Sequence, residues 1–195
     1  MENNEIDRAQ EEARIAQKAV RCVCRDSQKV QCEMTEIVTR IAQDVRECAD
    51  RLLDESGNER RYLMICRMLE CLEEQKRELD ARLAGSFYLD QPFMQAMHLC
   101  LDWEGTWMPQ IPRTAELELL GKRIEKAILC LQSEKERCAD CREKYSLLSR
   151  EIFPNFLLEV QRLSDADQNG RGMRAQSVCM LCGELCIHIS SIIQK

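Results

Sequence analysis

Residues 6–52 read IDRAQEEARIAQKAVRCVCRDSQKVQCEMTEIVTRIAQDVRECADRL and carry one uninterrupted helical pattern. Apolar or small residues recur in alternating steps of three and four, and no Pro or Gly interrupts them. The positions are Ile6, Ala9, Ala13, Ala16, Val20, Val23, Ser27, Val30, Met34, Ile37, Ile41, Val45, Cys48 and Leu52. This is the a/d stripe of a coiled-coil helix, with one phase slip where two steps of four follow each other at Ile41 and Val45.

A helix over this stretch would be roughly 70 Å long, whereas the average helix of a globular protein has about 11 residues. Such a helix needs neighbours of similar length to cover its stripe. The remaining sequence contains two further long periodic segments that can supply them. We therefore predict that the first helix spans residues 1–53 and that it packs against antiparallel partners.

The second long segment follows a turn at residues 54–58 and is expected to be helical over residues 59–103. Gly85 and Pro92 should bend it near residues 86–92. Its predicted apolar positions are Tyr62, Ile65, Leu69, Leu72, Leu79, Leu83, Phe87, Phe93, Met94, Met97, His98 and Leu101, with Met64, Met68 and Cys71 widening the stripe. Residues 104–113, EGTWMPQIPR, contain Gly105 and two prolines, and they predict a tip loop.

The third long segment is expected to be helical over residues 114–163, with a bend at Pro154. A polar, Gly-containing stretch over residues 164–172 precedes a last helix at residues 173–195, which is apolar on more than one side. The predicted fold class is all-α. It is an elongated antiparallel bundle of three long, kinked coiled-coil helices plus a short C-terminal helix, in one domain spanning residues 1–195. A dimer would cover the seams that a thin bundle exposes.

Composition narrows the classes of function. Among 195 residues, 32% are charged and only 5% aromatic, and the net charge is −6 with a pI of about 5.2. This acidic balance argues against a nucleic-acid binder, whereas binding to a membrane surface would need a localised basic face. The N-terminus, MENNEIDRAQEE, does not resemble a signal peptide, and no apolar run approaches the roughly 20 residues of a membrane span.

Two localised groups of basic residues are present. Arg14, Lys18, Arg21, Arg25 and Lys29 are spaced 4, 3, 4 and 4, so on a helix they share one face. Arg113, Lys122, Arg123 and Lys126 lie beside the tip loop, together with Trp103, Trp107 and Met108. Both groups are candidate contacts with anionic lipid, and tryptophan suits a membrane–water interface. The alternatives are that the first group is a solvated outer face and that the two tryptophans cap the hydrophobic end of the bundle.

Thirteen cysteines are spread through the helical stripes. We interpret them as small apolar residues in a reducing, cytoplasmic setting. The pairs Cys138/Cys141 and Cys179/Cys182 have the C-x-x-C spacing of zinc ligands, but both fall within helix patterns, so structural thiols are favoured and a zinc site shared between two chains is the alternative. The two histidines, His98 and His188, come without the glycine-rich loop or paired carboxylates of a catalytic site. We expect no enzyme activity, metal or cofactor.

Residues 115–163, AELELLGKRIEKAILCLQSEKERCADCREKYSLLSREIFPNFLLEVQRL, resemble the final helix of sorting-nexin-type and related small BAR domains. Residues 60–83, RRYLMICRMLECLEEQKRELDARL, are similar to the start of the second BAR helix. The resemblance is one of pattern and extends over nearly the whole chain. It implies a crescent-shaped dimer that senses or shapes membranes through basic residues on one face and at its tips.

The leading hypothesis from the sequence is a cytoplasmic, peripherally membrane-associated scaffold that binds curved anionic membranes as a homodimer, with a heterodimer as the alternative assembly. The second hypothesis is a coiled-coil adaptor that binds only other proteins. Binding to nucleic acid is not expected in either case.

Overall fold

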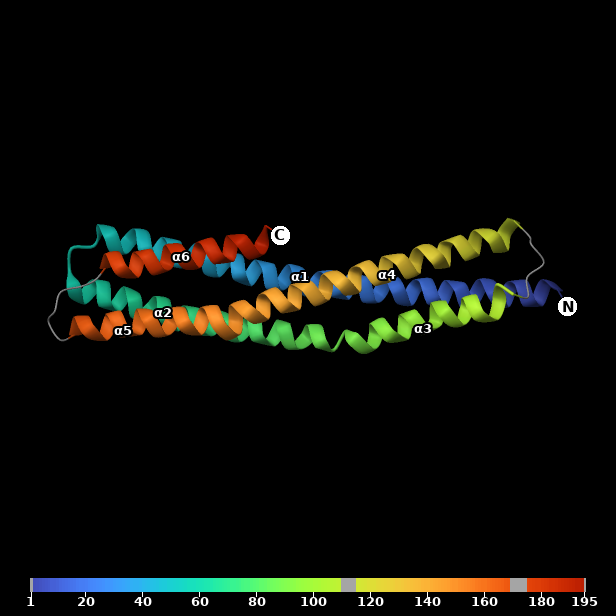
Figure 1. The fold of residues 1–195 in the computed structure, drawn as a ribbon, viewed down its shortest axis with the longest axis horizontal. Coiled ribbons are helices and arrows are strands. Elements are labelled where there is room, and N and C mark those ends of the chain that lie inside the picture. The colour runs from blue at the N-terminus through green and yellow to red at the C-terminus, as the bar shows by residue number, and fades with distance from the viewer. Residues whose placement is uncertain (1, 110–114, 169–174, 195) are drawn as a thin grey trace. The chain divides into compact units, whose positions relative to one another are not determined.

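The structure is a computed structural model that describes residues 2–109, 115–168 and 175–194 (Figure 1). Almost all of these residues are helical and none of them forms a strand, which confirms the predicted all-α class. The elements are α1 (Glu2–Asp54), α2 (Asn58–Phe87), α3 (Asp90–Trp107), α4 (Ala115–Leu147), the π-helical turn η1 (Leu148–Ile152), α5 (Phe153–Gln168) and α6 (Ala175–Ile193).

Helix α1 is a single helix of 53 residues, as its periodic stripe predicts. Every position of the predicted stripe is buried except Ile6 and Val30, which are half-buried. The 3.6-residue turn of the helix keeps this stripe on one side, so α1 offers a continuous apolar surface along its length.

Both long segments after α1 are interrupted at or near a proline. Tyr88 and Leu89 separate α2 from α3, and Pro92 occupies the first turn of α3, where a missing N–H group costs no helical hydrogen bond. The N–H of Phe93 donates to the Leu89 carbonyl at 2.9 Å. In the later segment, the N–H of Phe153 donates to the Leu148 carbonyl five residues back. This π-type turn ends at Ile152, two residues before Pro154, which cannot donate a backbone hydrogen bond.

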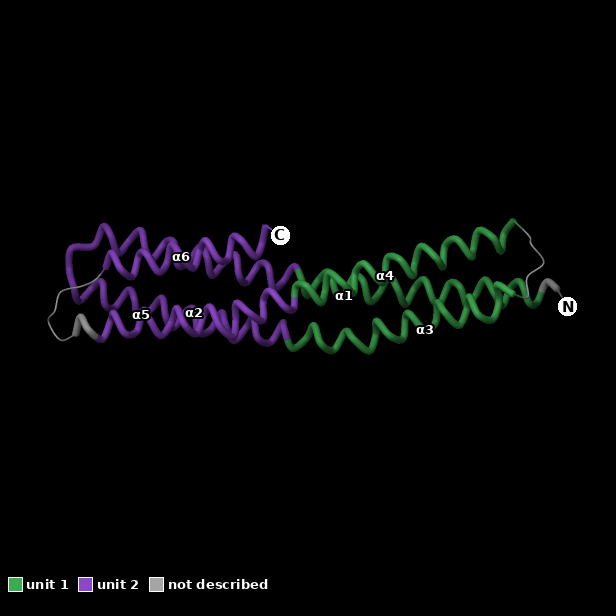
Figure 2. Tube along the Cα trace, in the orientation of Figure 1, with its two compact units in different colours: residues 1–31, 84–141 green, residues 32–83, 142–195 purple. Residues whose placement is uncertain are grey.

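The chain divides into two compact units (Figure 2). Unit 1 consists of Met1–Gln31 and Ala84–Cys141 and joins the first part of α1 to α3 and most of α4. Its core pairs small residues with large ones, because Ala9, Ala13 and Ala16 of α1 belong to the same cluster as Phe93 and Trp103 of α3.

Unit 2 consists of Cys32–Leu83 and Arg142–Lys195 and joins the second part of α1 to most of α2, to α5 and to α6. Most of its buried residues are aliphatic, including Ile37 and Ile41 from α1, Leu79 from α2, Val160 from α5 and Val178 from α6. Three aromatic residues, Tyr145, Phe153 and Phe156, are also buried in this unit. Helix α6 is held to α1 by two thiol hydrogen bonds, from Cys179 to the Ala49 carbonyl and from Cys186 to the Ala42 carbonyl, each at 3.4 Å.

By length and composition, α6 is apolar enough to cross a membrane, and it is the only helix of the described residues that meets this test. The sequence analysis expected no segment of this kind. A helix packed into a bundle meets the same test, and α6 buries Val178, Cys182, Leu185 and Ile189 within unit 2.

The predicted apolar face of α3 is correct at Phe93, which is buried, and at Met97, which is half-buried and packs against the core, but it is wrong at three other positions. Met94, His98 and Leu101 are exposed, whereas the buried residues are Phe93, Ala96, Cys100, Trp103 and Trp107, in steps of three and four. Phe87, predicted as the last seam residue of the preceding helix, is also exposed. The prediction continued from Phe87, whereas the buried line runs through its neighbour Ser86 and the half-buried Leu89 to Phe93, in steps of three and four. The apolar residue was therefore the wrong guide to the stripe, because a small polar residue occupies the buried position.

Candidate functional site

The predicted basic stripe forms an exposed face of α1 in unit 1. Arg14, Lys18, Arg21, Arg25 and Lys29, which we call the basic face, are all exposed. At about 100° per residue they occupy an arc of roughly 80°, on the side of α1 opposite the buried line of Ala13, Ala16 and Val20. The same periodicity that buries the small residues therefore presents the five cations together at the surface.

A shallow hollow of about 570 Å³ follows this face. Its lining comes from α1 alone and consists of Glu11, Arg14, Ile15, Lys18, Arg21, Cys22 and Arg25. Ile15 lies among the cations and is itself exposed. The hollow thus combines four of the five basic side chains with one apolar side chain.

The ion pairs on the basic face are local and weak. Arg14 pairs with Glu11 at 3.1 Å and Arg25 with Asp26 at 3.3 Å, and the four side chains are at least half exposed. The Nε–H of Arg21 donates to the Gln17 carbonyl at 3.4 Å. Exposed pairs of this kind contribute about 0–1 kcal/mol each, so a competing anion can displace them. Five cations against the two paired carboxylates leave a local surplus of positive charge.

The second predicted basic group is only partly described. Lys122, Arg123 and Lys126 are exposed on α4 in unit 1, whereas Arg113 lies outside the described residues. None of these three residues lines the hollow on α1. The structure therefore keeps the two basic groups on separate helices.

The two tryptophans are core residues of unit 1. This agrees with the alternative interpretation, in which they cover the hydrophobic end of the bundle, and not with a position at a membrane interface. Trp103 is only 2% exposed, and its indole N–H donates to the Ala9 carbonyl at 2.9 Å. Trp107 is buried, and its indole N–H donates to the Glu12 carboxylate at 2.7 Å. In this arrangement neither ring lies at the surface. Helix α3 continues through Trp107, so the predicted loop at residues 104–113 begins later than expected, and residues 110–113 lie outside the described chain.

Of the three residues predicted for the tip loop, Trp103, Trp107 and Met108, only Met108 is exposed. A Cβ atom placed on Gly121 of α4 would lie 3.1 Å from the Met108 sulfur. The side chain therefore rests against the open side of that glycine, and Gly121 is the feature of α4 that allows this close approach.

The two C-x-x-C pairs lie in different units, Cys138/Cys141 in unit 1 and Cys179/Cys182 in unit 2. No three His, Cys, Asp or Glu side chains of the described residues come together in a way that could hold a metal ion. Burial, with the neighbouring thiols of Cys48, Cys179 and Cys186, raises the pKa of Cys182 to about 12. The Cys182 thiol is thus protonated at neutral pH, which suits packing better than nucleophilic chemistry. His98 and His188 are both exposed, on α3 and α6 respectively.

A buried carboxylate on α4 escaped the sequence analysis. Glu134 is 1% exposed and lies between the buried Leu131 and Cys138, in steps of three and four along α4. Its oxygens accept hydrogen bonds from Gln31 at 2.9 Å and from Ser27 at 3.2 Å, and it pairs with Arg137 at 2.7 Å. The signal that could have identified it is the polar residue at the same level of the α1 stripe, Ser27.

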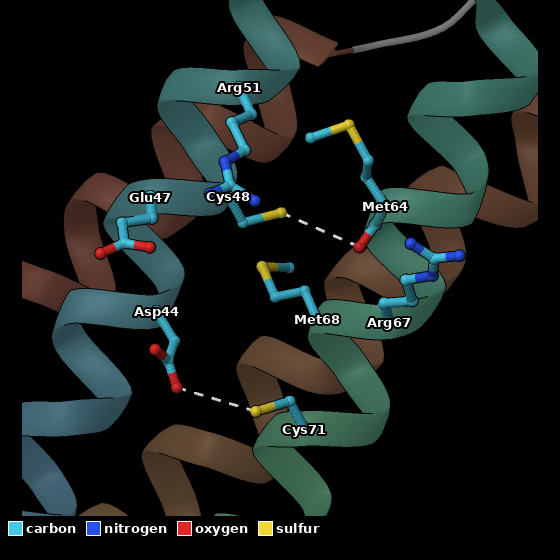
Figure 3. A pocket seen from close by; sticks show the side chains of 8 residues that line it. All are labelled: Asp44, Glu47, Cys48, Arg51, Met64, Arg67, Met68 and Cys71. Carbon is cyan, nitrogen blue, oxygen red and sulfur yellow. Dashed lines mark hydrogen bonds between the residues drawn. The ribbon is translucent and has the colours of Figure 1, made fainter.

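The sequence analysis also missed a hollow of about 240 Å³ between α1 and α2 in unit 2 (Figure 3). It is lined by Asp44, Glu47, Cys48, Arg51, Met64, Arg67, Met68 and Cys71. The row of Met64, Met68 and Cys71 was visible in the sequence as a widening of the α2 stripe. That Cys48 of α1 faces this row follows from the register between the two helices, which periodicity does not specify.

No protein-family model matches this chain, and no curated protein or solved structure matches it either.

Proposed function

We propose that this protein is a non-enzymatic, membrane-associated scaffold that binds anionic membranes through the basic face of α1. The observation that supports the proposal is the arrangement of five exposed cations on one side of a single helix, above a hollow that also contains the exposed Ile15. Cations attract the anionic headgroups, while an apolar side chain among them can enter the boundary of the acyl chains.

The proposal includes the BAR-like assembly that the sequence resembles. In that arrangement the long kinked helices of two copies would pair, and the basic faces of the two copies would act together on one membrane. Pairing would double the number of cations that face the membrane. The dimer would then bind the membrane more tightly than either copy does alone. Solution mass together with small-angle scattering tests the assembly, because a monomer would contradict it.

The membrane proposal is tested by co-sedimentation with liposomes that contain phosphatidylserine, at low salt. Reversing the four cations of the hollow, R14E/K18E/R21E/R25E, removes roughly 1 kcal/mol of attraction for each residue, so binding should weaken by about a thousandfold. Raising the salt concentration should also weaken binding by the wild type, because exposed charges are screened.

A matched control reverses four exposed cations elsewhere, in the variant R60E/R77E/K135E/R150E. Both variants have the same net charge, −14, since four reversals subtract eight from −6. The control should bind more tightly than the variant of the basic face. Equal loss in both would show that total charge and not this face governs binding, and no sedimentation of the wild type would overturn the membrane proposal.

The second candidate function is a protein–protein adaptor that does not bind membranes. It is favoured by exposed apolar side chains in unit 2, namely Leu158 on α5 and Met180 and Ile187 on α6. The last two lie on the side of α6 opposite its buried residues. If the wild type ignores anionic liposomes but its apparent solution mass rises on addition of a partner helix, the adaptor is the better description.

A further inference from the structure

The hollow between α1 and α2 has an unusual lining. Four of its eight lining residues are charged, namely Asp44, Glu47, Arg51 and Arg67, and each of the other four contains sulfur. The sulfur residues are Cys48, Met64, Met68 and Cys71. No aliphatic or aromatic side chain contributes to the lining, so the uncharged surface of this hollow is a surface of thiols and thioethers.

The spacing along both helices explains how these sulfur atoms meet. Met64, Met68 and Cys71 are separated by steps of four and three, so they lie on one face of α2. Cys48 projects from α1 into the same space. In Figure 3 the Cys48 thiol and the Met68 thioether both point into the space between the helices, with the Met64 side chain above them and Cys71 below.

Two weak thiol hydrogen bonds fix the ends of the hollow. The Cys48 thiol donates to the Met64 carbonyl at 3.9 Å, and the Cys71 thiol donates to the Asp44 carboxylate at 3.7 Å (Figure 3). Cys48 therefore lies at the level of the two methionines, whereas Cys71 belongs to the acidic end. One end of the hollow thus holds the thiol of Cys48 and the two thioethers, and the other end holds the thiol of Cys71 and the Asp44 carboxylate.

The other described hollow of unit 2 shows that such a lining is not a general property of the bundle. The hollow between α5 and α6 has the same volume, about 240 Å³, but its apolar lining comes from Ile152, Phe156, Leu181 and Leu185. It contains no sulfur atom. The apolar linings of these two hollows therefore differ in their chemistry.

We propose that this hollow binds one monovalent copper ion, with the Cys48 thiolate and the Met64 and Met68 thioethers as ligands. Soft thiolate and thioether groups select Cu(I), whereas Zn²⁺ is held by thiolates, imidazoles and carboxylates. Among the described residues no three His, Cys, Asp or Glu side chains form a group that could hold a metal. The methionines therefore complete the set of ligands, and they favour Cu(I) over Zn²⁺.

Binding exchanges one proton for one metal ion. The S–H bond of Cys48 breaks, an S–Cu bond forms, the proton goes to solvent, and the oxidation state of the copper does not change. A thiolate with a monovalent cation has no net charge, so loading adds no net charge to the hollow, whose lining contains two arginines and two carboxylates. The apparent affinity should therefore rise with pH, because the proton of the thiol must be displaced.

The first test observes the thioethers directly. The protein has nine methionines, and methyl-¹³C methionine gives one NMR signal for each of them. Titration with Cu(I) in the absence of oxygen should shift the signals of Met64 and Met68 with the first equivalent, and the variants M64L and M68L assign them. If these two signals stay in place while copper binds, the proposal is overturned.

The second test measures affinity by competition with the coloured Cu(I) chelator bicinchoninate. The variant M64L/M68L keeps all thirteen thiols and nearly the same side-chain volume, and it should bind the first equivalent at least tenfold more weakly than the wild type. The matched control M97L/M180L changes two methionines outside the hollow and should bind like the wild type. Equal affinity of the two double variants would assign the copper to thiols elsewhere and contradict the proposal. Circular dichroism checks that each variant is folded.

Discussion

Units 1 and 2 use the same helix, α1, in two different ways. In unit 1, α1 contributes Ala9, Ala13 and Ala16 to the core, and its partner α3 contributes large rings, Trp103 and Phe93. In unit 2, α1 contributes larger aliphatic residues such as Ile37 and Ile41, and the buried residues of its partners are mainly Leu, Ile and Val. The size of the residues along one stripe therefore indicates the size of the residues that must cover it, since cores fill space at a nearly constant density.

The largest expected effect is the loss of the ring that fills the alanine surface of unit 1. Trp103→Ala should lower the free energy of unfolding by about 4 kcal/mol, because it leaves a cavity beside small residues that cannot fill it. It also removes the indole N–H that donates to the buried Ala9. Urea unfolding followed by circular dichroism measures the loss.

Hydrogen exchange at neutral pH then locates the damage caused by Trp103→Ala. Amides of α3 and of α4 up to Cys141 should lose protection, while those of α5 and α6 in unit 2 should keep theirs. Trp103→Phe serves as the control and should cost less, since it retains a ring. A uniform loss of protection over both units would show that they unfold together, and it would contradict the division into two units.

The two units also differ in their buried thiols, which predicts a different response to alkali. Burial raises the pKa of Cys48 to about 11 and of Cys182 to about 12, both in unit 2. In unit 1, burial and the neighbouring Cys130 raise the pKa of Cys24 to about 12. A thiol with a raised pKa in the folded state keeps its proton when the unfolded chain, in which the thiol has its ordinary pKa of 9.0, loses it. Stability is therefore complete below pH 9 and falls as the pH rises toward 11.

Each such thiol lowers the free energy of unfolding by about 1.4 kcal/mol per pH unit in this range. At pH 10 the loss is about 3 kcal/mol for the two thiols of unit 2 and about half of that for Cys24. Both tryptophans lie in unit 1, so their fluorescence reports that unit alone. On alkaline titration, circular dichroism should change before tryptophan fluorescence, and the variant C48A/C182A should bring the two transitions together. Coincident transitions in the wild type would contradict the prediction.

The sequence predicted the parts of this molecule that depend on periodicity within one helix. The buried stripe of α1 and the exposure of its basic face both follow from steps of three and four, because such steps fix the side of a helix on which a residue lies. The buried face of α3 was predicted only in part, because the stripe passes through the polar Ser86 and not through the apolar Phe87. For Trp103 and Trp107 the sequence left two environments open, a membrane interface or the hydrophobic end of the bundle, and the structure buries both rings in the core of unit 1.

Features that depend on the register between helices could not be predicted. Cys48 is one of many cysteines in the sequence, and nothing in its own helix indicates that it faces Met64 and Met68. Glu134 lies at a stripe position of α4, three residues after Leu131, but the burial of its charge depends on Ser27 and Gln31 lying opposite. The sequence describes each stripe separately, whereas these sites arise where two stripes meet.

The smallest expected effect compares the polar contacts inside the two units. In unit 1 the Glu134 carboxylate is almost completely buried and accepts hydrogen bonds from Ser27 and Gln31. In unit 2 the Asp80 carboxylate, which accepts hydrogen bonds from Lys76 at 2.8 Å and from Ser149, is 44% exposed. Glu134→Ala should cost about 2 kcal/mol, because the buried carboxylate and its donors lose each other. Asp80→Ala should cost less, about 1 kcal/mol, because water replaces the partly exposed contact with Lys76 and only the buried Ser149 loses its acceptor. Urea unfolding of both variants measures the difference in the free energy of unfolding. Glu134→Gln retains one acceptor oxygen, so its loss in free energy of unfolding should lie between those of the two alanine variants. Equal costs for the two alanine variants would mean that burial of the carboxylate does not set the strength of these contacts.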